Sequence, residues 1–325
     1  MLIGITYDLK SEYLNMGYSE EHVAEFDTEE TIEGMDNALK SLGYQTDRIG
    51  NVKNLIERLN NGKRWDLIFN ICEGFYGTGR EAQVPAVLDI YNIPYTFSDV
   101  CIMSLTLNKA LTKHIVMNAG FKTAPFNVIN TIEDAYNIEM MYPLFIKPVY
   151  EGTGKGIDKK SLVNNKSELI SSCSEKIQKK FNPLLVEKYL SGREFTVGIL
   201  GTASNSKVIG VIEVNYNNEM GEKIYSYQTK TDYEKLVNYS IPEAEIINLC
   251  SEMALGIWNL LGCCDAGRID VRMDENNILN FIEINPLAGL NYKHSDLPIM
   301  CKLNGITFNE LIKEIIDSAR SRYQI

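Results

Sequence analysis

The segment RIDVRMDENNILNFIEIN, residues 268–285, constrains the fold more than any other part of the chain. Apolar and polar residues alternate on both sides of Asn276-Asn277, and a period of two is typical of β-strands. Asparagine tolerates the positive φ angles of a tight turn, so the pair predicts a two-residue turn between the strands. One face of the resulting antiparallel hairpin is apolar and is expected in a core: Ile269, Val271, Ile282 and Ile284.

The two-residue turn also determines which polar residues face each other. It places Asp270 across from Glu283 and Arg268 across from Asn285, with facing Cβ atoms about 5 Å apart. Two adjacent carboxylates repel each other, whereas Mg²⁺ binds carboxylate oxygens and lets substrate phosphates complete its shell. Asn285 adds a carbonyl oxygen, and Arg268 can stabilise phosphate or oxyanion charge. This face therefore predicts a magnesium site, and an exposed polar hairpin face is the alternative.

The N-terminal third alternates strand and helix patterns, which predicts a parallel sheet covered by helices. A capping-box pattern at Asp27 and Glu30 is expected to open the first helix, which runs to about Leu42. Residues 71–83 follow the third strand, and ligands of open parallel sheets bind beyond the carboxyl ends of strands. This loop is therefore a candidate site, with a solvated turn as the alternative. The expected strands are 2–7, 44–49 and 66–70, and a second helix is expected at 51–61.

A strand that carries a lysine precedes a glycine-rich loop. The strand LFIKP, residues 144–148, contains Lys147 and leads into YEGTGKG, residues 150–156. Glycine lets backbone N–H groups approach oxygen atoms closely, so the lysine and the loop together suit a flap over phosphates. The loop has neither the P-loop pattern nor the dinucleotide fingerprint, and a plain hairpin loop is the alternative. A helix from about residue 99 towards Gly120 carries a further lysine, Lys109.

The segment LLVEKYLSGREFTV, residues 184–197, could bind a nucleoside. Glu187 and Glu194 lie seven residues apart around a turn at Ser191-Gly192. Backbone groups of 187–190 could then bind an adenine edge while Glu194 accepts hydrogen bonds from ribose hydroxyls. A purely structural pair of strands is the default interpretation.

Length and composition exclude several classes of protein. A chain of 325 residues suggests two or three domains. A net charge of −11 argues against a duplex nucleic-acid partner, since such proteins need basic patches. Seven cysteines without a C-x-x-C motif, and only three histidines, make a zinc site unexpected and favour a reducing compartment. No apolar run approaches the roughly 20 residues of a membrane helix and no basic leader is evident, so we expect a cytoplasmic protein without a membrane partner.

Seven segments stand in a definite order and spacing along the chain: NIPYTFSDV (92–100), LNKALTK (107–113), FIKPVYEGTGKG (145–156), LLVEKYLSGREFTVGILG (184–201), GRIDV (267–271), FIEINPLAGL (281–290) and HSDLP (294–298). Together they resemble the D-alanine–D-alanine ligase branch of the ATP-grasp superfamily. The likeness extends from about residue 64 to 316, and more loosely through the N-terminal unit. It implies an α/β fold of three domains, with ATP between the second and third. These are an N-terminal Rossmann-like (pre-ATP-grasp) substrate domain with a parallel sheet at 1–103, a central lid domain at 104–186 and a C-terminal catalytic domain at 187–325.

The resemblance implies ATP and Mg²⁺ as cofactors, with two ions and with Mn²⁺ as a substitute. Asp270, Glu283 and Asn285 match the magnesium ligands, which agrees with the hairpin argument. Glu194 corresponds to the residue that binds ribose. The remaining residues of the implied ATP site are Lys109 and Lys147 at the phosphates, Thr153 and Gly154 in the flap, and the adenine linker of Glu187, Lys188, Tyr189 and Leu190.

The same resemblance implies the catalytic groups. Arg268 and the N–H of Gly289 match the pair that stabilises the oxyanion, and Lys230 matches the phosphate-contacting lysine of a mobile loop. Ser295 matches the serine that binds the carboxylate of the second substrate. The implied reaction joins two small amino-acid-like substrates through an acyl phosphate and releases ADP. A homodimer through the N-terminal domain is also implied.

The departures from the family pattern concern the substrates. Glu73 replaces a histidine that helps to fix the first amino acid, and a glutamate there favours an amine or guanidinium. Thr231 replaces an aromatic residue involved in substrate choice, and Thr153 and Gly154 replace two flap serines. The glutamate that grips the first amine has no clean match, and Glu25 and Asp27 are the candidates.

These departures favour a carboxylate–amine ligase of altered specificity over a genuine D-alanine–D-alanine ligase of cell-wall synthesis, which is the first alternative. A nucleotide-binding sensor that has lost catalysis is the alternative of another class. An NAD-binding protein fits less well, because no G-x-G-x-x-G follows the first strand.

Overall fold

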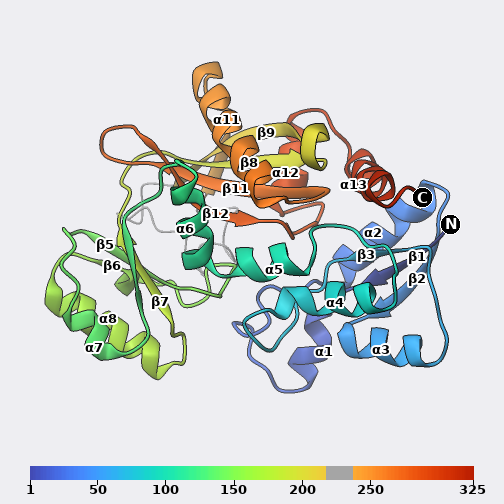
Figure 1. The fold of residues 1–325 in the computed structure, drawn as a ribbon, viewed down its shortest axis with the longest axis horizontal. Coiled ribbons are helices and arrows are strands. Elements are labelled where there is room, and N and C mark those ends of the chain that lie inside the picture. The colour runs from blue at the N-terminus through green and yellow to red at the C-terminus, as the bar shows by residue number, and fades with distance from the viewer. Residues whose placement is uncertain (217–236) are drawn as a thin grey trace.

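The computed structural model describes residues 1–216 and 237–325, and within them it contains three β-sheets with helices packed around them (Figure 1). The expected α/β class is confirmed, with a parallel N-terminal sheet and two antiparallel sheets. Lys230 and Thr231 lie outside the described residues. None of the helices in the described part combines the length and the apolarity that a bilayer crossing needs.

The N-terminal sheet is parallel and has the order β2-β1-β3. Its apolar side chains alternate between two faces, as the period of two requires. Ile3 and Ile5 pack towards α2 and α13, whereas Ile49 and Ile68 pack towards α3 and α4. The elements are β1 (Leu2–Thr6), α1 (Lys10–Asn15), α2 (Glu29–Ser41), β2 (Gln45–Gly50), α3 (Val52–Asn60), β3 (Leu67–Asn70), the 3₁₀ turn Arg80–Ala82 and α4 (Gln83–Ile90).

The expected capping box at Asp27 and Glu30 is wrong. Helix α2 begins one residue later than expected, and the N-cap is Thr28, whose hydroxyl accepts from the N–H of Thr31. Thr28 takes the role because its backbone is extended and its short side chain reaches the first free N–H groups. Asp27 is thereby left to line a cavity, and Glu30 forms an ion pair with Lys293.

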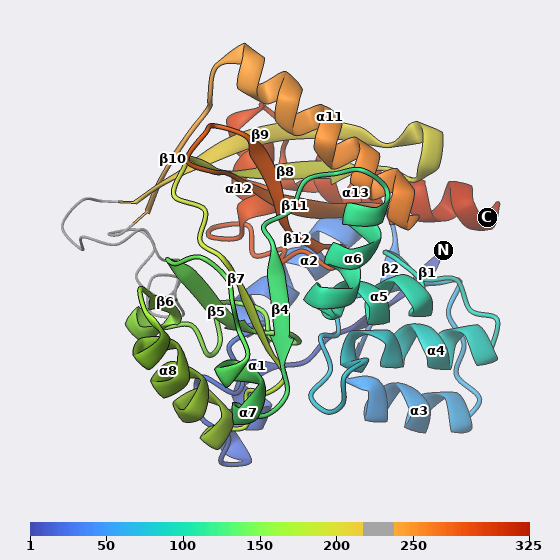
Figure 2. The ribbon, with the colours of Figure 1, turned by 60° about the vertical axis from the view of Figure 1, so that its left-hand side comes forward.

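The central sheet is antiparallel, with the order β4-β7-β5-β6. Ile146 and Val186 pack against α7 and α8 on one face, and Figure 2 shows these helices along the outer side of the sheet. Lys147 and Glu187 alternate with them, so they project from the opposite face. The predicted domain boundary at 186/187 falls inside β7, and the three domain limits stay a prediction. The elements are β4 (Phe126–Ile129), α7 (Ile132–Tyr136), β5 (Leu144–Pro148), the 3₁₀ turn Lys159–Ser161, β6 (Leu162–Val163), α8 (Lys166–Gln178) and β7 (Leu184–Lys188).

The single helix expected from residue 99 to Gly120 is wrong, because Asn108 divides it into α5 (Val100–Leu107) and α6 (Lys109–Asn118). Asn108 has an extended ψ of 92°, and its side-chain oxygen caps α6 by accepting from the N–H of Leu111. Its Nδ2 also donates to the Tyr150 hydroxyl at 2.9 Å. The break therefore places Lys109 in the first turn of α6, beside the glycine-rich loop.

The C-terminal sheet has the order β10-β9-β8-β11-β12. Apolar side chains of β8 and β11 pack on α11 on one face, including Val197 and Ile269 against Trp258. A capping box of Thr307 and Glu310 opens the last helix. The elements are β8 (Glu194–Leu200), the 3₁₀ turn Ala203–Asn205, β9 (Lys207–Tyr216), β10 (Val237–Ser240), α11 (Ala244–Leu261), β11 (Ala266–Met273), β12 (Leu279–Asn285), α12 (Asp296–Leu303) and α13 (Phe308–Tyr323).

The hairpin of β11 and β12 has the expected facing residues but not the expected turn. Asp270 pairs with Glu283 and Arg268 with Asn285, as predicted. The turn, however, is a three-residue loop that ends at Asn277 with φ 59°, and the N–H of Asp274 donates to the Ile278 carbonyl. A bulge between Asp270 and Val271 compensates for the one-residue shift.

The bulge has a consequence for the site. Ile282 is the extra residue of β12, because Asp270 pairs with Glu283 and Val271 with Phe281. Ile282 was expected on the apolar face, but it lines the same cavity as Asp270 and Glu283.

Candidate functional site

One continuous cleft runs between the central sheet, the C-terminal sheet and the N-terminal segment 24–31. Two cavities adjoin there and share lining residues: Thr153, Tyr239, Arg268, Glu283 and Asp296. The walls are the polar faces of the two antiparallel sheets, whose apolar faces are turned to helices. We call the cavity beside the central sheet the nucleotide half, and the cavity beside residues 24–31 the N-terminal half.

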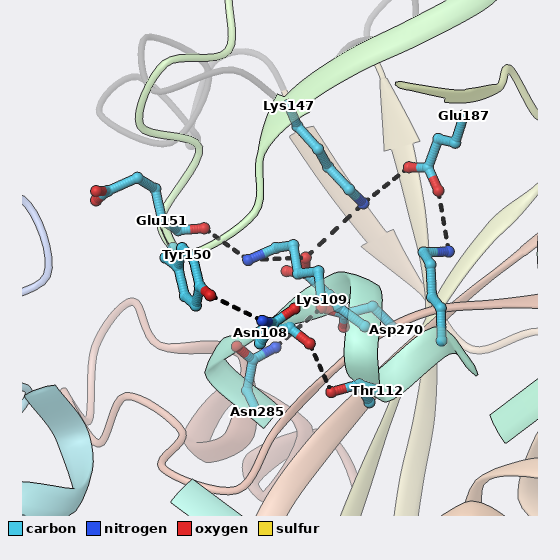
Figure 3. Close-up of polar contacts among 12 residues, drawn as sticks. Asn108, Lys109, Thr112, Lys147, Tyr150, Glu151, Glu187, Asp270 and Asn285 are labelled. Carbon is cyan, nitrogen blue, oxygen red and sulfur yellow. Dashed lines mark hydrogen bonds and ion pairs between the residues drawn. The ribbon is translucent and has the colours of Figure 1, made fainter. Parts of the chain in front are cut away.

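The nucleotide half contains a buried cluster of two lysines around one glutamate (Figure 3). Lys113 Nζ and Lys147 Nζ each lie 2.9 Å from a different carboxylate oxygen of Glu187. Their side chains are at most 5% exposed. Burial raises the pKa of Glu187, but Lys113 and Lys147 outweigh it and the net shift is downward. The cluster therefore keeps two cations at the base of the cleft with one anion between them.

Glu283 connects this cluster to Lys109. Its carboxylate lies 3.7 Å from Lys109 Nζ and 4.0 Å from Lys147 Nζ. Burial opposes ionisation, yet the two lysines and Arg268 lower the pKa of Glu283 to about 2. Lys109 Nζ also donates to the Glu151 carbonyl at 2.6 Å, so it holds the flap beside the carboxylate. The negative charge of Glu283 is thus stable at neutral pH.

Asp270 is the residue whose surroundings are least complete. Its Oδ1 is buried without a hydrogen-bond partner, and Oδ2 accepts from Asn285 Nδ2 at 3.3 Å. Burial raises the pKa of Asp270 to about 7, with Glu283 and Asp296 adding to the rise and Arg268 opposing it. A buried carboxylate oxygen without a donor is costly unless a cation binds it.

These residues fit a divalent cation. Asp270, Glu283 and Asn285 present hard oxygen atoms on one face of the hairpin, which is the donor chemistry of Mg²⁺. In the described ranges no three His, Cys, Asp or Glu residues are placed so that they could hold a metal ion by themselves, so ligand phosphates would have to complete the shell. That requirement is typical of Mg²⁺ sites that bind nucleotides.

Arg268 lies at the junction of the two halves together with Gly289 and Ser295, which belong to the loop between β12 and α12. The guanidinium of Arg268 forms an ion pair with Asp296 and lies 3.6 Å from Asp270. Ser295 precedes α12, and its hydroxyl accepts from the N–H of Asn291. A Cβ on Gly289 would come within 2.9 Å of the Ser295 hydroxyl, so the loop requires glycine for this approach. The residues expected to stabilise an oxyanion and to bind a second carboxylate are therefore neighbours.

The far end of the nucleotide half is less charged. Residues 187–190 line it together with Phe145 and Ile282. Glu194 lies 3.1 Å from Arg272, and the Arg272 guanidinium stacks 5.1 Å from the centroid of the Tyr189 ring. Backbone edges and apolar walls of this kind suit a flat heterocycle, with Glu194 at its rim.

The glycine-rich flap is attached to the N-terminal segment. The N–H of Gly152 donates to Glu25 Oε1 at 2.9 Å, and Arg80 donates to both Glu25 oxygens at 2.9 and 3.0 Å. Arg80 also donates to the Tyr150 carbonyl at 2.8 Å. A Cβ at Gly152 would approach Glu25 Oε1 to 2.4 Å, so only glycine permits this contact. Thr153 and Gly154 follow with φ of 53° and 71° and line the cleft.

The N-terminal half has an acidic wall formed by Asp27, Glu73 and Glu81. Burial is the main cause of the raised pKa of all three carboxyls. The pKa of Asp27 and that of Glu81 both rise to about 7, with added repulsion from Asp8 and Glu25 respectively. The pKa of Glu73 rises well above its usual value, because Glu81 and Glu25 add their repulsion to burial.

Most of the residues expected in the site line this single cleft, whereas several that line or support it were not expected. The unexpected ones are Lys113, Asp296, Arg80 and Glu81. Lys113 had a detectable signal, because it follows Lys109 by four residues and therefore lies on the same helical face. Arg80 and Glu81 belong to the loop 71–83 that was expected to hold a site, but its sequence does not indicate which side chains turn inward.

Known proteins resemble this chain in sequence and in fold. Residues 115–317 match the family described as D-ala D-ala ligase C-terminus. The D-alanine–D-alanine ligase of Wolbachia pipientis is 32% identical and the match covers 87% of this chain and 86% of that protein. The Thermotoga maritima enzyme of the same name is 28% identical, over 88% of this chain and 90% of the relative.

Two solved structures have the same fold. The D-alanine–D-alanine ligase from Bacillus anthracis complexed with ATP superposes with a TM-score of 0.75 at 22% identity, over 100% of this chain and 99% of that chain. The VanG D-Ala:D-Ser ligase from Enterococcus faecalis gives a TM-score of 0.74 at 19% identity, over 98% and 99%.

Proposed function

The chain belongs to the D-alanine–D-alanine ligase family of ATP-grasp enzymes, and we propose that it joins the carboxylate of one amino-acid-like substrate to the amine of a second through an acyl phosphate. The observation that carries the proposal is one cleft in which Asp270 and Glu283 face each other beside Lys109, Lys147 and Arg268. Anionic oxygens and cationic nitrogens alternate there within about 4 Å, as nucleotide phosphates and a counterion require.

The residues of this chain divide the work of the two steps. Lys109 and Lys147 hold the phosphates of ATP while the first carboxylate attacks the γ-phosphate, which yields an acyl phosphate and ADP. The deprotonated amine of the second substrate then attacks the acyl carbon, and Arg268 with the Gly289 N–H stabilises the tetrahedral oxyanion. Collapse of this intermediate breaks the bond to the phosphate oxygen and releases inorganic phosphate with the amide product. Ser295 holds the carboxylate of the second substrate.

The metal and the flap support these steps. A divalent cation held by Asp270, Glu283 and Asn285 would neutralise phosphate charge when bound. The flap, held by Glu25 through Gly152, excludes water that would hydrolyse the acyl phosphate. Positioning and fixed charge supply most of the catalysis.

The specificity differs, on our proposal, from that of the enzymes whose names the relatives carry. Glu73 lines the N-terminal half together with Glu81 and Asp27. An acidic wall of this kind does not suit the small, uncharged side chain of alanine. A genuine D-alanine–D-alanine ligase is the alternative, and the likeness to enzymes of that name favours it.

A coupled ADP assay with pairs of D- and L-amino acids tests the proposal. We expect ADP release that requires ATP, Mg²⁺ and an amino acid, with a second amino acid increasing the yield of dipeptide. High activity with D-alanine alone would favour the alternative. ATP binding without ADP release for any pair would instead indicate a nucleotide sensor.

A further inference from the structure

The acidic wall of the N-terminal half lacks matching cations. Asp27, Glu73 and Glu81 line the cavity, and among the described residues none of the three carboxylates has a Lys, Arg or His nitrogen within 4.0 Å. All three residues are partly buried, and a carboxylate removed from water needs a cation, a hydrogen-bond donor or a proton to offset the lost hydration. The unpaired carboxylates therefore require an explanation.

The nearest cations are already committed to the flap. Both oxygens of Glu25 accept from Arg80, which also binds the Tyr150 carbonyl. Lys155 lies 2.6 Å from Glu151 and 3.6 Å from Glu25. Arg80 and Lys109 still lower the pKa of Glu81 from a distance, but the contacts of both cations within 4.0 Å are with other groups.

The cleft is defined independently of these acids by the groups at its other side. The same cavity is lined by Lys109, Arg268 and Ser295, where the phosphates and the reacting carboxylate of the first substrate would lie. The acidic wall therefore faces the end of that substrate remote from its reacting carboxylate. A simple amino acid brings one α-ammonium to this wall, which can neutralise one carboxylate of the three.

We propose that the first substrate carries a second cationic group, a side-chain ammonium or guanidinium, which binds between Glu73 and Glu81. This inference rests on the proposed ligase function and names the class of acid that the enzyme activates. A diamino acid or a guanidino acid satisfies the wall: one carboxylate binds the α-ammonium and the remaining two bind the side-chain cation.

Trapping the acyl phosphate with hydroxylamine tests the inference on the first half-reaction alone. The full-length chain is given ATP, Mg²⁺, hydroxylamine and single acids, and hydroxamate and ADP are both measured. The acids form isosteric pairs that differ in charge: lysine and 2-aminoheptanoic acid, ornithine and norleucine, arginine and citrulline, each as D and L forms. Because hydroxylamine replaces the second substrate, the assay reports only on the first.

We expect kcat/KM for the best cationic acid to exceed that of its neutral isostere by at least about 100-fold. Glu73→Gln and Glu81→Gln should each reduce this ratio by at least about tenfold, with the KM for ATP unchanged. Glu57→Gln, an exposed glutamate on α3 far from the cleft, is the control and should leave the ratio as in the wild type.

The outcomes separate this inference from the proposed function. Hydroxamate formed equally from charged and neutral members would overturn the inference while leaving the ligase function intact. A strong charge preference that survives both Glu73→Gln and Glu81→Gln would also overturn it, because the selectivity would then reside elsewhere. If no acid yields either ADP or hydroxamate, the proposed function is refuted, and the inference is refuted with it.

Discussion

The two halves of the cleft hold charge in opposite ways. In the nucleotide half each buried anion has cationic neighbours: Glu187 lies between Lys113 and Lys147, and Glu283 faces Lys109. In the N-terminal half the carboxylates outnumber the cations. The compensated half carries its own counter-charges, whereas the uncompensated half must obtain a counter-charge from a proton or from its ligand.

The largest effect should come from breaking the compensated cluster. Glu187→Gln leaves Lys113 and Lys147 buried without their anion, so we expect a loss of about 3–5 kcal/mol in the free energy of unfolding. Urea denaturation measures this. The matched control is Glu175→Gln, because Glu175 also binds two lysines, Lys160 and Lys179, but at the surface. The control should cost far less, because water and salt screen a pair at the surface, and equal losses would show that burial does not strengthen the cluster.

The second prediction concerns the ion pair of Arg80 with Glu25, which holds the flap where the two halves of the cleft meet. Arg80→Leu leaves Lys155, at 3.6 Å, as the one cation within 4.0 Å of the buried Glu25 among the described residues. We expect destabilisation by about 2–4 kcal/mol and a fall in kcat of about tenfold, since the flap loses its attachment. Arg58→Leu is the control, because its partner Asp47 is partly exposed, and it should cost less than about 1 kcal/mol. An unchanged kcat in Arg80→Leu would show that the flap does not depend on the ion pair of Arg80 with Glu25.

A smaller effect concerns pH and the uncompensated half. The pKa of Glu81 is raised from 4.5 to about 7, chiefly by burial, so the folded chain holds a proton that the unfolded chain loses near pH 4.5. Folding then takes up a proton between pH 4.5 and 7, and the stability of the ligand-free protein falls as the pH rises through this range. Glu81→Gln should remove this loss and gain on the order of 1–3 kcal/mol over wild type between pH 5 and 8.

Urea titrations at pH 5 and pH 8 measure the difference, with Glu57→Gln as the exposed control. If the free energy of unfolding changes equally between pH 5 and pH 8 in Glu81→Gln and in the wild type, the pKa of Glu81 is not raised in the ligand-free protein and the prediction is wrong.

The sequence predicted the nucleotide half better than the N-terminal half, and the reason is physical. Strand alternation determines which residues share a face, and it placed Asp270 and Glu283 on the same face. That they stand directly opposite each other was predicted from a wrong turn, and the result was right because the longer loop at Asn277 and the bulge at Ile282 cancel. Local patterns determine the face well, whereas turn length, bulges and therefore register depend on packing.

The acidic wall depends on contacts between distant segments, which no local pattern reveals. Arg80 lies 55 residues after Glu25 in the sequence. Gly152, whose N–H donates to Glu25, lies 127 residues after Glu25. Asp27 was expected to cap a helix, but the cap is Thr28, whose hydroxyl accepts from the N–H of Thr31. The sequence predicted that Glu73 favours an amine or guanidinium, and this stays a prediction, whereas the excess of negative charge around it became visible only in the fold.

Removing the metal ligands tests the central claim, that ATP is bound and cleaved where Asp270, Glu283 and Asn285 converge. The measurement is ATP turnover, in the presence of Mg²⁺ and a substrate acid, by the double variant Asp270→Asn with Glu283→Gln. The account predicts a fall on the order of a thousandfold in a protein that still folds, and the same fall when EDTA is added to the wild type. Turnover at the wild-type level in the double variant would contradict it.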